Sequence, residues 1–97
     1  MNDRFASQRK VTATALLDGP GATPAALRQA IASGVPPPQL QALVAKIRSR
    51  AYTIADADID PLRSQYSEDQ LFEIIVSAAF GAASERLAAA HHALEEA

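Results

Sequence analysis

The chain has 97 residues, of which 48% are hydrophobic and only 5% aromatic, and its formal net charge is −2. This length supports one small domain, and alanine, which occupies 22 positions, favours closely packed helices. The interspersed charges leave no basic face of the size that nucleic-acid binding needs, and the absence of cysteine excludes thiol nucleophiles, disulfides and thiolate metal sites. No stretch is long and apolar enough to span a membrane, and the polar start does not resemble a signal peptide, so we expect a soluble cytoplasmic protein.

The first part of the chain predicts two helices separated by strong helix breakers. A helix is expected over residues 4–17, and the DGPG sequence at 18–21 ends it. Thr23 and Pro24 then predict the start of a second helix, with the Thr23 hydroxyl as its cap and Pro24 at the first helical position. Gly34 provides a left-handed residue at the end of this helix, and the three prolines that follow prevent its continuation.

The middle of the chain predicts a third helix over about residues 38–52, followed by an Asp-rich joint. The third helix has a buried stripe at three- and four-residue spacing, made by Leu40, Leu43, Val44, Ile47, Ala51 and Ile54. A short fourth helix begins near Asp58 or Asp60, and the neatest arrangement has Asp60 as its cap and Pro61 at the first helical position. Asp56, Asp58 and Asp60 resemble the start of a calcium loop, but the glycine and the closing acid that such a loop requires are missing. We therefore expect these acids to stabilise a helix start and not to bind a metal.

The longest predicted helix covers about residues 68–94 and begins with a capping box formed by Ser67 and Gln70. One of its apolar faces has nearly the spacing of a coiled-coil seam and comprises Phe72, Val76, Phe80, Ala83, Leu87, Ala90 and Leu94. The second apolar face is limited to the first half of the helix and comprises Leu71, Ile74, Ile75, Ala78, Ala79 and Ala82. A chain this short cannot bury both faces alone, so we predict a homo-oligomer with an interface that includes Phe72, Val76, Phe80, Ala83 and Leu87.

The order of these elements resembles the helical core of the alkylhydroperoxidase D-like and carboxymuconolactone decarboxylase superfamily. The resemblance covers roughly residues 40–94, and its specific parts are the joint, the capped SEDQLFE sequence at 67–73 and the alanine-rich segment that follows. It implies an all-α domain that assembles into trimers or hexamers. In the redox members a Cys-x-x-Cys-x-x-x-His run reduces peroxides, whereas here Ala51 and Ile54 stand at the cysteine positions and Asp58 at the histidine position. The resemblance thus implies the architecture without dithiol peroxidase activity.

Alignment with that superfamily also suggests a small-ligand pocket, with polar side chains from Tyr52, Asp58, Arg50 and Glu73. The plainer interpretation of Tyr52 is a side chain that buries its ring and shows its hydroxyl to water. His91 and His92 point in different directions on a helix, so we expect them to be exposed or at an interface. Gly81 is more typical of a close helix crossing than of a ligand contact.

Three functions are open at this point, all for a single helical domain over residues 1–97, with N-terminal helices and a Pro-rich linker at 1–37 and the core at 38–97. The leading one is a non-catalytic, homo-oligomeric superfamily member that binds a partner or a small ligand, without a cofactor or a metal. The second is a lyase or isomerase for a small organic acid or lactone, with Tyr52, Asp58 and Arg50 around its pocket. The third is a helical subunit whose C-terminal half docks on another protein.

Overall fold

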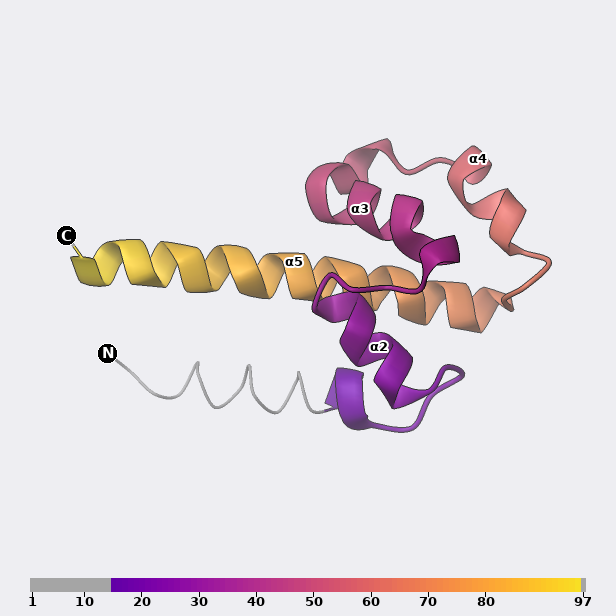
Figure 1. Cartoon of the computed structure of the whole chain (residues 1–97), viewed down its shortest axis with the longest axis horizontal. Helices are drawn as coiled ribbons and strands as arrows, with labels where there is room; N and C mark the ends of the chain where they lie inside the picture. The colour runs from indigo at the N-terminus through magenta and orange to yellow at the C-terminus, as the bar shows by residue number, and fades with distance from the viewer. Residues whose placement is uncertain (1–14, 97) are drawn as a thin grey trace.

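The computed structural model describes residues 15–96, and these form α-helices and short 3-10 turns with no strand among them. The elements are α2 (Ala25–Ala32), η1 (Pro38–Leu40), α3 (Gln41–Arg50), η2 (Ala51–Thr53), α4 (Asp56–Ile59), η3 (Asp60–Leu62) and α5 (Glu68–Glu96). Helix α5 is the axis of the fold, with α2 on one side of it and α3 and α4 on the other (Figure 1). The predicted all-α class is confirmed for the described part. The helix expected over 4–17 lies mostly outside the described residues, of which 15–18 are helical.

Helix α2 differs from the prediction at its start and agrees with it at its end. Pro24 precedes the first helical residue, and the Thr23 hydroxyl donates to Glu73 of α5 instead of capping α2. The predicted role of Thr23 is therefore wrong, because a charged acceptor from another helix takes its hydroxyl. At the other end Gly34 has a φ of 81°, and the N–H groups of Gly34 and Val35 donate back to carbonyl oxygens of α2, as expected for a glycine-terminated helix.

The Asp-rich joint begins its short helix earlier than expected. Helix α4 starts at Asp56, and Asp60 opens the following 3-10 turn without a capping bond from its side chain. Asp58 instead accepts a hydrogen bond from the Ala55 N–H at 2.9 Å, which satisfies a free donor ahead of the helix. Asp60 pairs with Arg63 at 3.0 Å. The preferred prediction, a cap at Asp60, is wrong because Asp58 at the third helical position already reaches back to the helix start.

The core lies where α5 meets α2 and α3. Its buried members are Ile31, Leu40, Leu43, Val44, Ile47, Leu62, Leu71, Ile74 and Ala78. The stripe predicted on α3 is buried from Leu40 to Ile47, but Ala51 is exposed and Ile54 only half-buried. This difference arises because α3 ends at Arg50 and the chain then turns through η2, which breaks the helical periodicity.

Two local features hold α5 in place. The predicted capping box is present, since the Ser67 N–H donates to Gln70 Oε1 at 2.8 Å and the Gln70 N–H donates to Ser67 Oγ at 3.1 Å. Further along, α5 crosses α2 at Gly81, which is buried. A Cβ atom on Gly81 would lie 2.7 Å from the Cα and the carbonyl carbon of Ala32, and closer still to the carbonyl oxygen. Gly81 therefore serves a close helix crossing, as predicted.

Candidate functional site

An apolar face of α5 lies outside the core of the described residues, and we call this face the α5 seam. It comprises Phe72, Val76, Phe80, Ala83, Leu87, Ala90 and Leu94. At about 100° per residue these positions lie on the side of the helix opposite the buried Leu71, Ile74 and Ala78. Phe72 is 68% exposed, Leu87 47% and Leu94 77%, and no seam residue belongs to the core cluster described above. The predicted interface residues thus share one outward surface.

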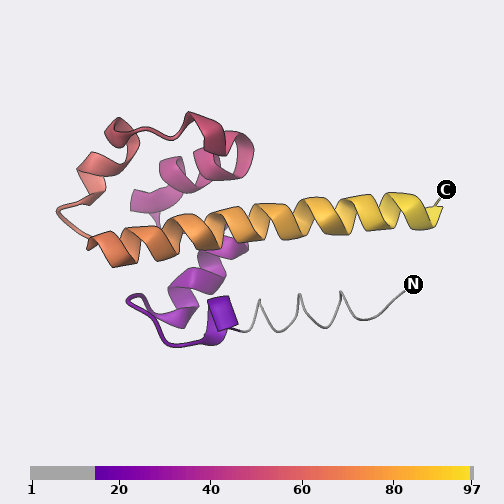
Figure 2. The same ribbon diagram turned by 180° about the vertical axis from the view of Figure 1, so that it is seen from behind.

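The second half of α5 extends past the other described elements, as two opposite views show (Figures 1 and 2). Every residue from 83 to 96 is exposed except His91, which is half-buried. The polar contacts that join this half to α3 come from Glu85 and Arg86, and both reach Arg48. Isolated helices of this length are only marginally stable in water, so a packing partner would stabilise the projecting half.

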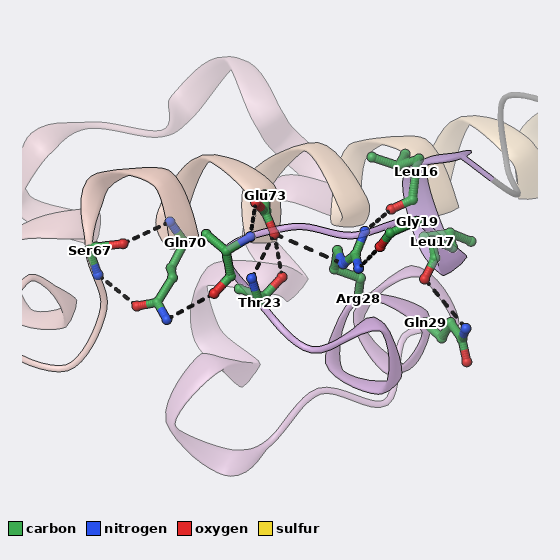
Figure 3. Close-up of polar contacts among 10 residues, drawn as sticks. Leu16, Leu17, Gly19, Thr23, Arg28, Gln29, Ser67, Gln70 and Glu73 are labelled. Carbon is green, nitrogen blue, oxygen red and sulfur yellow. Dashed lines mark hydrogen bonds and ion pairs between the residues drawn. The ribbon is translucent and has the colours of Figure 1, made fainter.

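Helix α5 is fixed to the loop before α2 through the carboxylate of Glu73 (Figure 3). This carboxylate accepts hydrogen bonds from the Thr23 hydroxyl at 2.6 Å, the Ala22 N–H at 2.6 Å and the Thr23 N–H at 2.9 Å. The Thr23 hydroxyl is the largest cause of a lowered pKa of Glu73, followed by the Ala22 N–H, and the nearby Arg28 adds to the effect. Glu73, one of the residues suggested for a ligand pocket, is therefore engaged in joining two segments of the fold.

Arg28 is a structural residue that the sequence reasoning missed. It is 3% exposed, and its guanidinium donates to the carbonyl oxygens of Leu16, at 2.6 Å, and Gly19 (Figure 3). Its Nε lies 3.9 Å from Glu73 Oε1. Its position three residues before the buried Ile31 was a signal that it shares the inner face of α2.

Two of the residues suggested for a ligand pocket line one depression beside α3. Arg50 and Asp58 border it together with Lys46 and Ser49, and its volume is about 340 Å³. Lys46 Nζ donates to both Asp58 oxygens, at 2.9 and 3.1 Å. This hydrogen bond is the largest cause of a lowered pKa of Asp58, and the Ala55 N–H adds to it. The Asp58 carboxylate is thus ionised and already paired with a cation.

The other suggested pocket residues lie elsewhere. Tyr52 is 86% exposed and does not line the depression, so the interpretation that its ring is buried is wrong. It lies in η2, where the chain leaves α3, and this exposes the ring. Glu73 lies on α5 and faces the Thr23 loop. Ala51 and Ile54, at the superfamily's cysteine positions, are respectively exposed and half-buried.

Comparisons with known proteins identify no matching family model, no matching curated protein and no matching solved structure. The superfamily suggested by the order of the helices is therefore still a hypothesis. No helix within residues 15–96 has the length and apolar character needed to cross a membrane.

Proposed function

We propose that this protein is a non-catalytic interaction module that associates with copies of itself through the α5 seam. The observation that carries the proposal is the exposure of Phe72, Leu87 and Leu94 on a single face, directly opposite the core. Large apolar residues that gather on one face of a small protein are typical of an interaction surface. The projecting half of α5 carries two of these three residues, so a partner would cover it as well.

The energetics favour burial of this surface. Removing one large aliphatic or aromatic side chain from water contributes about 1.5–3 kcal/mol. Leu87 and Leu94 are only partly covered in one copy, and a symmetric pair buries them from both copies. Their combined contribution is comparable with the cost of association, which is about 4–15 kcal/mol. Contacts of the half-buried Val76 and Phe80 add to this balance.

Within this proposal the chain is an alkylhydroperoxidase D-like protein that lacks dithiol chemistry, with the order of its helical elements as the support. A hexamer, one of the two assemblies that this resemblance implies, would contain three pairs joined at the seam. We do not advance the lyase or isomerase alternative, because Tyr52 and Glu73 lie outside the depression that Arg50 and Asp58 share.

The test compares two substitutions on the projecting half of α5. Leu87→Asp places a charge in the seam, whereas Ala89→Asp places the same charge on an exposed position of the opposite side. We expect the unaltered protein and Ala89→Asp to be oligomers by light scattering at micromolar concentration, and Leu87→Asp to be a folded monomer by circular dichroism. A monomeric unaltered protein would contradict the proposal and favour docking on a different protein.

A further inference from the structure

Within residues 15–96, the bulk of the domain lies at one end of α5. Helices α2 and α3 pack on the half of α5 that contains Leu71 and Ala82, and residues 83–96 project from it (Figure 2). A parallel pair would place both bulky ends side by side and leave the two thin projecting halves to face each other. An antiparallel pair would lay each projecting half on the thicker half of the partner. The two arrangements therefore differ in what covers each projecting half: the partner's projecting half in the parallel pair, and the partner's thicker half in the antiparallel pair.

The seam alternates large and small side chains, and this alternation also distinguishes the two directions. Phe80, Leu87 and Leu94 occupy one position of a seven-residue repeat, and Val76, Ala83 and Ala90 occupy the other. In a parallel pair each residue faces the same residue of the partner. Two Phe80 side chains therefore meet in one layer, and two Ala83 side chains meet in the next. Helices held apart by paired aromatic rings would leave gaps at the alanine layers. In an antiparallel pair the two positions face each other, so Phe80 and Leu87 each meet an alanine and Leu94 meets a valine.

We infer, building on the proposed self-association, that two copies pair antiparallel along the α5 seam. Phe80 faces the partner's Ala90, Ala83 faces the partner's Leu87, and Val76 faces the partner's Leu94. The alternative register, shifted by seven residues, sets Ala90 against Glu73 and Leu94 against Asp69, and so loses two apolar layers. Arg86 lies near the centre of the chosen register, where the partner's Arg86 approaches it. Its guanidinium already donates to the Arg48 carbonyl oxygen, which holds this charge beside its own domain.

The absence of cysteine makes the chain a clean background for a test of direction. Two variants, Val76→Cys and Leu94→Cys, are purified separately and then either kept alone or refolded together, and each sample is treated with a short bismaleimide cross-linker. In the antiparallel register the two copies of residue 76 are 18 helical residues apart, or about 27 Å along the axis. Neither variant alone should then form a covalent dimer, whereas the refolded mixture should form one that contains both variants. Ala89→Cys, on the opposite face, is the control and should not cross-link.

The outcomes separate this inference from the proposed function. Covalent dimers within each variant alone would show a parallel pair, which overturns the antiparallel inference and leaves self-association intact. A monomeric unaltered protein would remove both proposals. In that case, protection of the Leu94→Cys variant's thiol from a monofunctional maleimide would show that another part of the same chain covers the seam.

Discussion

Replacing Gly81 with alanine tests the helix crossing on which the fold depends. A new Cβ at this position would lie 2.7 Å from the Cα and the carbonyl carbon of Ala32 in α2. Both are backbone atoms, so no change of rotamer relieves the contact. The two helices would have to separate by about 1 Å to reach an ordinary carbon–carbon distance of about 3.5–4 Å. Such a shift would loosen the packing around Ile31, which is fully buried in α2.

Two opposing effects determine the size of the change in the free energy of unfolding. Alanine is favoured over glycine within a helix by about 1 kcal/mol, which by itself would stabilise the variant. Forcing extra atoms into a packed core typically costs about 1–3 kcal/mol, and the loosened α2–α5 contact adds to this cost. We expect a net loss of about 1–2 kcal/mol for Gly81→Ala. For a domain of this size that corresponds to a decrease in Tm of roughly 5–15 °C.

The matched control is Ala79→Gly, two residues earlier in the same helix at an exposed position. There only helix propensity acts, so glycine should lower stability by about 1 kcal/mol. Thermal unfolding followed by circular dichroism, together with urea titration, measures both variants. The protein should therefore be more stable with alanine than with glycine at position 79, and more stable with glycine than with alanine at position 81. A Gly81→Ala variant as stable as the unaltered protein, or more stable, would refute the account of the crossing.

Further predictions concern the polar contacts. Glu73→Gln should lower stability at neutral pH by about 1–2 kcal/mol, because it weakens charge-assisted hydrogen bonds to Thr23, which is 5% exposed. The pKa of Glu73 is lower in the folded protein than its ordinary value of 4.5. The ionised carboxylate therefore stabilises the fold above pH 4.5, and this stabilisation is lost as the pH falls below that value. Urea unfolding between pH 3 and 7 should thus show a steeper acid loss in the unaltered protein than in Glu73→Gln. Asp58→Ala should lower Tm more than Asp60→Ala, because Asp58 holds both Lys46 and the Ala55 N–H; equal effects would argue against this role. A thiol-coupled assay with an alkyl hydroperoxide should show no turnover, since the chain has no cysteine.

The features predicted correctly from sequence are those set by neighbours within one helix. The Ser67–Gln70 capping box and the glycine at the end of α2 depend on residues a few positions apart, and both are present. The apolar stripe of α3 follows from helical spacing in the same way from Leu40 to Ile47, but not at Ala51 and Ile54, which lie beyond the end of the helix. The extent of α5 was also close to the prediction, because its start has a strong cap and no proline interrupts it.

The features that sequence reasoning missed depend on contacts between distant segments. Thr23 looked like a local cap, but its partner Glu73 is 50 residues away in the chain. The sequence reasoning gave Arg28 no role, yet it is buried and donates to carbonyl oxygens in the turn that precedes α2. For the candidate site, the spacing indicated two apolar faces on α5, and the seam was assigned to the interface because one short chain cannot bury both. The packing of α2 and α3 against the other face leaves the seam outside the core of the monomer.

The choice between the two faces follows from the sizes of their side chains. The face that packs inside the domain carries Ser77, Ala78, Gly81 and Ala82 at the crossing, and these small residues let the backbones of α2 and α5 approach closely. Phe72 and Phe80 in that place would hold the helices apart. The larger side chains therefore lie on the outer face, although exposing a large apolar side chain to water costs more free energy than exposing a small one. In the inferred register, a second copy would cover Phe80 and Leu87 with alanines and recover part of this free energy without altering the packing of the monomer.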